Sequence, residues 1–88
     1  MMTQEITVEN KLGLHARPSA LLVKAATKYR SDFFIEKDGM KVNGKSIMGV
    51  MMLAAEFSSK LLLIADGVDE EYLLKEITQM FASHFGED

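Results

Sequence analysis

An 88-residue chain without cysteine has to be held together by its own hydrophobic core. No disulfide can stabilise it, and its two histidines form no Cys/His cluster that could hold a structural zinc ion. A core of this size forms when regular secondary structure packs into two layers. We therefore expect a single domain over residues 1–88, built from amphipathic helices and strands.

The charge distribution argues against two classes of partner. The formal net charge is -3 and the basic residues are scattered singly, so the basic patch of a nucleic-acid-binding domain is missing. The longest uncharged apolar stretches, residues 48–55 and 61–65, are too short to cross a membrane, and the N-terminus has no signal-peptide pattern. We expect a cytoplasmic monomer that binds no nucleic acid and does not insert into membranes.

Four segments are predicted to be strands. Apolar and polar residues alternate with a period of two at residues 4–8, 33–36 and 40–42. Asp38-Gly39 lies between the last two of these segments and is typical of a two-residue hairpin turn. Residues 61–65 are apolar at consecutive positions, which indicates a strand covered on both faces or one that lies centrally in the sheet.

Three segments are predicted to be helices. Residues 16–29 contain no glycine, and the only proline, Pro18, lies in the first turn, where its missing N–H costs nothing. Ser46 is a favourable N-cap for the short apolar segment 47–55. Residues 69–71 place negative charge in the first turn of a last helix, whose apolar residues recur at helical spacing.

The predicted order is therefore β-α-β-β-α-β-α. In so short a chain, one antiparallel sheet with helices on one face is the natural way to pack elements in this order. The sequence contains no repeat, linker or low-complexity tract. We expect an α+β fold.

The start of the first predicted helix breaks two rules of helix stability. A helix is stabilised by Ser, Thr, Asp or Asn at its N-cap and by acidic residues in its first turn. Here His15 lies near the cap, and Arg17 places a positive charge at the positive end of the helix dipole. A bound anion would correct both features, because it would contact the free backbone N–H groups and the guanidinium. We predict that the missing partner is an anion.

Two interpretations of His15 fit these residues. One is a solvated histidine that caps the helix. The other is a nucleophile, because an imidazole beside a bound phosphate can attack phosphorus, and the dipole and Arg17 should keep that imidazole neutral near pH 7. The presence of Arg17 favours the nucleophile. His84 provides a contrast, since we expect it in the last turn of the final helix, where a histidine suits the dipole without a chemical role.

Two motifs resemble those of a known family. Residues 13–18 read Gly-Leu-His-Ala-Arg-Pro, and residues 45–51 read Lys-Ser-Ile-Met-Gly-Val-Met. Together they resemble the HPr family, the histidine-containing phosphocarriers of the bacterial phosphoenolpyruvate-dependent phosphotransferase system. The resemblance covers essentially the whole chain. It implies an open-faced β-sandwich with a four-stranded antiparallel sheet in the order 1-4-2-3 and three helices on one face.

The resemblance also implies a mechanism. His15 is expected to accept a phosphoryl group on Nδ1 from phosphorylated enzyme I and to pass it to a histidine of an enzyme II A-type domain. Arg17 is expected to stabilise the group in transit, together with the backbone N–H groups of Ala16 and Arg17. No metal or other cofactor is implied. The protein is expected to be a covalently modified intermediate rather than an enzyme.

Ser46 is implied to be a regulatory site. In relatives with this segment, a serine kinase/phosphorylase modifies the serine, and the modification weakens transfer at the histidine. A phosphate at a helix N-cap is tolerated by the helix and adds about -1.5 to -2 charge. An ordinary, unmodified N-cap serine is the alternative.

The apolar residues that follow Ser46 are expected to face solvent. Ile47, Met48 and Met51 are predicted to form an exposed patch beside His15 that docks several partners. Residues 54–60 depart from the family pattern, since many relatives carry a glycine just before the last strand. Phe57 is expected either to cover the sheet edge or to extend the binding surface.

Other functions fit the chain less well. A purely regulatory module would act through Ser46 alone, as family members without the histidine do, and the presence of His15 and Arg17 favours the carrier. An acyl-carrier-like protein modified on Ser46 would be an all-helical bundle, against the predicted strands. Sugar uptake and the nitrogen-linked branch of the phosphotransferase system use the same histidine site, so a carrier can serve either.

Overall fold

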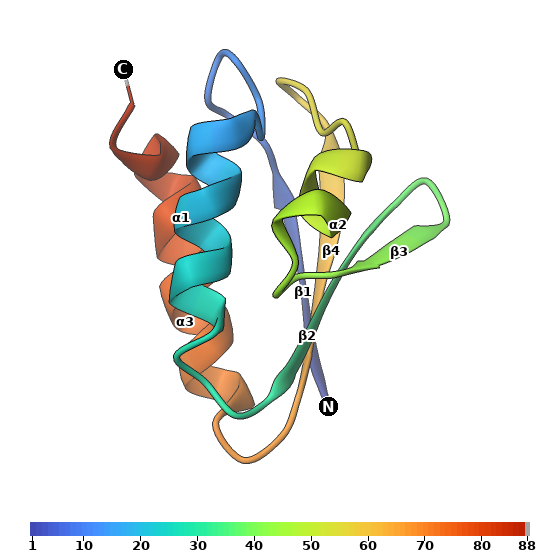
Figure 1. Ribbon diagram of the computed structural model, residues 1–88, viewed down its shortest axis with the longest axis vertical. Coiled ribbons are helices and arrows are strands. Elements are labelled where there is room, and N and C mark those ends of the chain that lie inside the picture. The colour runs from blue at the N-terminus through green and yellow to red at the C-terminus, as the bar shows by residue number, and fades with distance from the viewer. Residues whose placement is uncertain (88) are drawn as a thin grey trace.

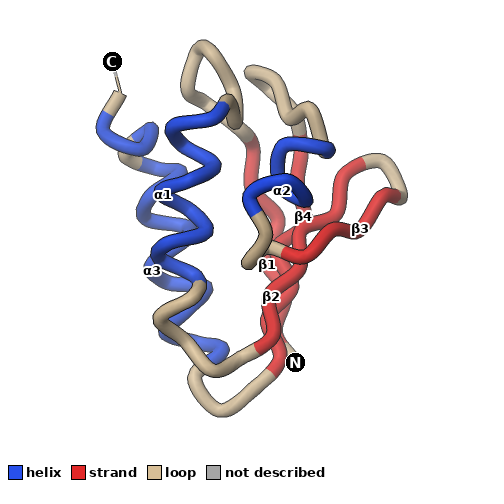
Figure 2. The backbone as a smooth tube through the Cα atoms, in the orientation of Figure 1, coloured by secondary structure: helices blue, strands red, loops and turns tan. Residues whose placement is uncertain are grey.

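The computed structural model describes residues 1–87, and its elements follow the predicted order (Figures 1 and 2). They are β1 (Met2–Thr7), α1 (Ala16–Ala26), β2 (Asp32–Lys37), β3 (Met40–Asn43), α2 (Ile47–Met52), β4 (Lys60–Asp66), α3 (Glu70–Ala82) and a short 3-10 turn, η1 (His84–Gly86).

The four strands form one antiparallel sheet in the order β1-β4-β2-β3. Strand β4 lies between β1 and β2, so that Leu63 is opposite Gln4 on one side and Ile35 on the other. This confirms the sheet order that the family resemblance implies. It also explains the consecutive apolar residues of β4, because a central strand has neighbours on both edges.

All three helices pack on one face of the sheet, which leaves the other face open (Figure 1). On the covered face, Leu61, Leu63 and Ala65 of β4 are at most 2% exposed. On the open face, Leu62 and Ile64 are only half-buried. The helices contribute further fully buried side chains to the same core, among them Leu22, Val50, Leu73 and Ile77. The open-faced β-sandwich is therefore confirmed.

Helix α1 ends at Ala26, three residues earlier than predicted. After it, the N–H groups of Lys28 and Tyr29 bond to carbonyls three residues back, in a tighter turn than an α-helix. Both side chains are held by Glu76 of α3, which accepts from Lys28 Nζ at 2.7 Å and from the Tyr29 hydroxyl. The hydrogen bond to Glu76 raises the pKa of Tyr29 to about 12.

Helix α2 is also shorter than predicted, because it ends at Met52 and not near Ala55. Ala54 has φ 49°, in the left-handed region, where the chain cannot continue a right-handed helix. Ser58 has φ 73°. The segment that departs from the family pattern thus contains two left-handed residues, neither of which is glycine.

The position predicted for His84 is wrong. Helix α3 ends at Ala82, and His84 lies beyond it in η1 with φ 55°. Its Nε2 atom is 3.6 Å from Glu9 Oε1. His84 therefore lies outside the last turn of α3, because the chain leaves the helix before this residue.

Asp69 joins the start of α3 to the turn after α1. Its carboxylate accepts hydrogen bonds from the Ser31 hydroxyl, from Ser31 N at 2.9 Å and from Arg30 N at 3.0 Å. These bonds, the one from the Ser31 hydroxyl first, lower the pKa of Asp69 to about 2.

Candidate functional site

His15 is the N-cap of α1, but its imidazole does not cap the helix. The residue is extended, with φ -77° and ψ -171°, and its carbonyl accepts the first helical hydrogen bond from Ser19 N at 3.0 Å. The N–H groups of Ala16 and Arg17 precede that bond, so they have no partner within the helix. The first turn therefore offers two backbone donors beside a half-buried imidazole.

The loop before His15 is held by close backbone contacts. Gly13 has φ +67°, and a Cβ atom added to it would lie 2.3 Å from the carbonyl oxygen of Ala55. The next residue, Leu14, donates its N–H to that same oxygen at 2.8 Å. The fully buried Asn10 donates from Nδ2 to the Gly13 carbonyl at 2.5 Å. These contacts place His15 against the loop that follows α2.

The carboxylate of Glu87 lies at the start of α1, where the sequence predicts an anion. Its Oε2 atom is 2.9 Å from His15 Nε2 and 3.3 Å from Arg17 Nη1. Its Oε1 atom is 3.4 Å from Asn10 Nδ2. Glu87 is the most buried of the three charged or titratable groups, with a side chain 17% exposed against 36% for His15 and 58% for Arg17.

Glu87 reaches this position through a sharp turn after α3. His84, Phe85 and Gly86 all have left-handed φ angles, of 55°, 54° and 77°. Phe85 is buried against Phe81, with the rings edge to face and their centroids 4.9 Å apart. Its carbonyl is 3.4 Å from Arg17 Nη1. The buried ring of Phe85 therefore anchors the segment that carries Glu87 to His15.

Sequence reasoning missed Glu87. The residue lies 72 positions from His15, and its only signal was an acidic C-terminus following a helix. Sequence reasoning predicted the need for an anion but looked for it outside the chain.

Ser46 caps α2 as predicted. Its Oγ atom accepts a hydrogen bond from Gly49 N at 3.1 Å, and the residue is half-buried. Lys45, its neighbour, donates from Nζ to the Tyr29 carbonyl at 2.8 Å and so ties this turn to the end of α1. In the part of the chain that the structure describes, no hydrogen bond joins Ser46 to His15 or Arg17.

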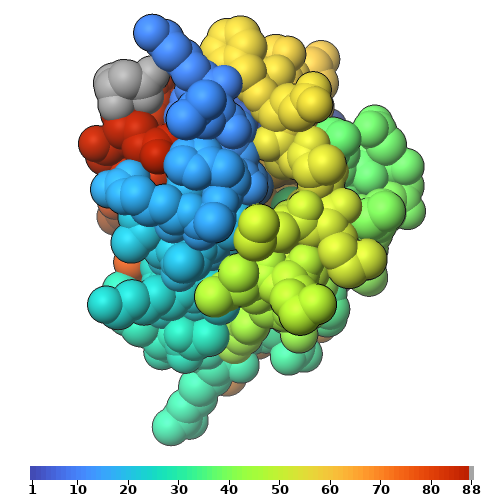
Figure 3. All heavy atoms as spheres, turned by 45° about the horizontal axis from the view of Figure 1, so that its top comes forward, coloured from blue at the N-terminus to red at the C-terminus, as the bar shows by residue number. Residues whose placement is uncertain are grey.

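The residues predicted to dock partners are exposed. Ile47, Met48 and Met51 are 44%, 78% and 45% exposed, and we name these three the α2 patch. The start of α1 and helix α2 occupy the same face of the molecule (Figure 3). Phe57, in the loop between α2 and β4, is 57% exposed, so its ring is no part of the core.

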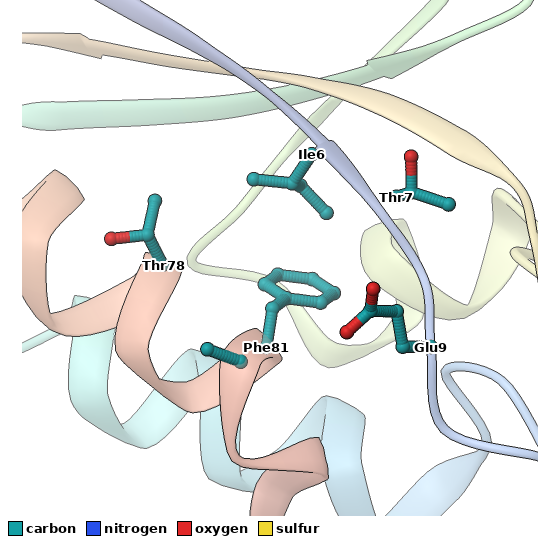
Figure 4. Close-up of a pocket in the computed structure, with 6 residues that line it drawn as sticks. Ile6, Thr7, Glu9, Thr78 and Phe81 are labelled. Carbon is teal, nitrogen blue, oxygen red and sulfur yellow. The ribbon is translucent and has the colours of Figure 1, made fainter.

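A separate pocket lies between β1 and the C-terminal half of α3 (Figure 4). The residues lining it are Ile6, Thr7, Glu9, Thr78, Phe81 and Ala82. Among the described residues, neither His15 nor Arg17 contributes to it. Glu9 is its one ionisable group there, and a single carboxylate beside threonines and apolar side chains indicates no catalytic arrangement.

Within residues 1–87, no helix combines the length and the apolar character needed to cross a bilayer.

Comparison with known proteins gives matches along the whole chain. Residues 2–83 match the family model described as "PTS HPr component phosphorylation site". The HPr-like protein Crh of Bacillus subtilis is 49% identical over 77 residues, which are 88% of this chain and 91% of that protein. The phosphocarrier protein HPr of Xylella fastidiosa is 43% identical over 88 residues, covering 100% of this chain and 99% of that protein.

Solved structures are similar as well. A crystal structure of HPr from Thermoanaerobacter tengcongensis gives a TM-score of 0.97 at 45% identity, covering 100% of this chain and 99% of that chain. A structure described as an HPr dimer from the same organism gives a TM-score of 0.80 at 46% identity, covering 99% of this chain and 100% of that chain.

Proposed function

The chain belongs to the HPr family of phosphocarriers, and on that premise we propose that it accepts a phosphoryl group on His15 from phosphorylated enzyme I and passes it to a histidine of an enzyme II A-type domain. One observation carries this proposal. The His15 imidazole lies at the N-terminus of α1 without capping that helix, and it contacts the same carboxylate oxygen, Glu87 Oε2, as the Arg17 guanidinium.

The transfer consists of two displacements at phosphorus. In the first, the Nδ1 lone pair of His15 forms an N–P bond while the bond between phosphorus and the enzyme I histidine breaks, and its electron pair returns to that histidine. In the second, the enzyme II histidine attacks, and the pair of the broken bond returns to His15 Nδ1. Every bond that forms replaces one that breaks, so the two steps need no further reactant, which fits a carrier rather than an enzyme.

The start of α1 supplies the electrostatic stabilisation. The phosphoryl group carries negative charge through both steps, and the N–H groups of Ala16 and Arg17 point to the N-terminal end of the helix, where its dipole is positive. The Arg17 guanidinium adds a full positive charge and several donors. These donors act where charge is transferred, in the manner of an oxyanion hole.

The α2 patch is the proposed docking surface for enzyme I and for the A-type domains. Its three exposed side chains belong to a helix on the same face of the molecule as the start of α1, and they suit partners of different shape, because methionine adapts its conformation to each. We propose that the protein meets these partners in the cytoplasm. A monomer presents this surface freely, and light scattering at working concentration tests that state against a dimer.

Incubation with phosphoenolpyruvate and enzyme I tests the carrier function. We expect one acid-labile, alkali-stable phosphate per chain, absent from His15→Ala and present in His84→Ala. Labelling of His15→Ala, or no labelling of the wild type, contradicts the proposal.

Ser46 phosphorylation is a second proposed function, favoured by the position of this residue. Its half-buried hydroxyl caps the helix that carries the α2 patch, so a phosphate there adds charge beside the docking surface while the N-terminus of α2 tolerates it. A serine kinase/phosphorylase is the proposed partner. Ser46→Asp should weaken transfer to His15 with the fold unchanged by circular dichroism, and Ser58→Asp is the control. Equal transfer in all three proteins contradicts this regulation.

A further inference from the structure

Glu87 is a charged neighbour of His15 that the transfer scheme above does not use. Its Oε2 atom lies 2.9 Å from Nε2, the ring nitrogen that does not take the phosphoryl group. An ionised carboxylate only accepts hydrogen bonds. The contact is therefore a hydrogen bond in which Nε2 carries the proton.

The position of that proton decides which nitrogen can attack. In a neutral imidazole one nitrogen is a donor and the other holds a lone pair. A proton kept at Nε2 leaves the lone pair on Nδ1, and a fixed Nε2–H bond also fixes the plane of the ring. The same arrangement of a carboxylate behind a histidine orients the base of serine hydrolases and the histidines of metal sites.

We propose that Glu87 is the positioning residue of His15, which holds the proton on Nε2 so that Nδ1 is the nucleophile in acceptance and the leaving nitrogen in donation. The inference rests on the proposed carrier function. The proton stays on Nε2 through both steps, while the Nδ1–P bond forms and then breaks with its electron pair returning to Nδ1. Glu87 touches neither phosphorus nor its oxygens in this scheme.

One hydrogen bond to the side chain and the packing of a preceding residue hold Glu87 in place without Arg17. Asn10, fully buried and itself bonded to the Gly13 carbonyl, reaches the other oxygen, Oε1, at 3.4 Å. The buried ring of Phe85 anchors the backbone two residues before Glu87. Arg17, by contrast, is 58% exposed. Its guanidinium is therefore free to leave Oε2 for the phosphoryl group, while the carboxylate stays with Nε2.

Nitrogen-15 NMR of the unphosphorylated, histidine-labelled protein tests the ring directly. At a pH where the imidazole is neutral, we expect the wild type to show the Nε2–H tautomer with an Nε2 proton that exchanges slowly with water. Arg17→Ala should keep this signal, whereas Glu87→Ala should lose the slow exchange and gain Nδ1–H tautomer. An Nδ1–H tautomer in the wild type, or unchanged exchange in Glu87→Ala, overturns the proposal.

Transfer kinetics from phosphorylated enzyme I give the second test. With the Glu87→Ala protein as substrate of enzyme I, we expect kcat to fall about tenfold and KM to stay unchanged. Tenfold is the lower end of what loss of a histidine-orienting carboxylate costs in metal sites. Glu87→Gln keeps an acceptor oxygen without the charge, so its kcat should lie between those of the wild type and Glu87→Ala. Glu56→Gln removes an exposed carboxylate from the loop next to Gly13 and should transfer like the wild type.

The outcomes separate this inference from the carrier function. Labelling of His15 with wild-type kcat in Glu87→Ala overturns the role of Glu87 alone, as does an effect on KM only. Loss of labelling in the wild type overturns the carrier function, whatever tautomer the ring adopts.

Discussion

His15 Nε2 and Glu87 Oε2 lie 2.9 Å apart, although 72 residues separate the two in the chain. The contact joins the start of α1 to the turn after α3. It places a carboxylate beside a helix N-terminus and an arginine, both of which attract negative charge. A phosphoryl group that arrives at His15 therefore enters a site already organised around an anion.

Arg17→Ala should slow transfer from phosphorylated enzyme I about tenfold or more. Removal of one preorganised donor from a transferring group costs about 10²–10³ in rate in enclosed sites, and the exposure of Arg17 reduces the effect here. Arg17→Lys should be intermediate, because it keeps the charge but not the planar fork. Radiolabel transfer measures both. Lys75→Ala, which removes an exposed cation from α3, is the control, and an equal loss in that variant would point to net charge instead.

Phe85→Ala should destabilise the protein by about 3 kcal/mol, because it leaves a cavity where a buried ring packed. It should also release the segment that holds Glu87 and so abolish the slow exchange of the His15 Nε2 proton. Urea unfolding and NMR measure the two effects. Phe57→Ala removes a ring that is 57% exposed and should change the free energy of unfolding by less than about 0.5 kcal/mol.

Gly13→Ala should destabilise the protein by at least about 2 kcal/mol. The left-handed φ of +67° costs a non-glycine residue about 1 kcal/mol, and the new Cβ atom would lie 2.3 Å from the Ala55 carbonyl oxygen. Gly39→Ala separates the two causes, since φ is +83° there but no atom lies within 4 Å of the added Cβ. Its cost in urea unfolding should stay at about 1 kcal/mol. Equal costs would show that the clash is relieved by movement of the loop.

Ser58→Gly should stabilise the protein by about 0.5 kcal/mol. Ser58 is exposed with φ 73°, so glycine removes backbone strain, and the larger entropy of the unfolded glycine chain offsets part of the gain. Ala20→Gly, at an exposed position of α1, should instead destabilise by about 1 kcal/mol. Thermal unfolding measures both, and destabilisation by Ser58→Gly would contradict the strain argument.

Because of Asp69, the free energy of unfolding should decrease in acid. Its pKa in the folded protein is about 2, below the ordinary 3.8, so its contribution to stability is present above about pH 4 and is lost as the pH falls towards 2. Asp69→Asn should therefore lose less stability than the wild type over that window in urea unfolding. Glu71→Gln removes an exposed carboxylate of the same helical turn and should behave like the wild type.

The pattern of residues predicted most of the fold for local reasons. The alternation around Asp38-Gly39 predicted the β2–β3 hairpin, and Ser46 predicted the start of α2, because turns and caps depend on residues close in sequence. The predicted ends of α1 and α2 each lie about three residues beyond the ends in the structure. The end of α1 is held by Glu76, some fifty residues on, and the left-handed Ala54 that follows α2 lies in a loop whose geometry no short-range pattern specified.

The sequence alone determined that an anion belongs at the start of α1, because His15 and Arg17 break the rules of a helix N-terminus and that conflict is local. Only the tertiary structure decided that Glu87 supplies a carboxylate there. Glu87 reaches His15 because the chain reverses direction after α3 and the buried Phe85 anchors that turn. The side chain of Asn10 then binds the second carboxylate oxygen of Glu87. Contacts between distant segments depend on how the helices pack on the sheet, and no local pattern of residues specifies that packing.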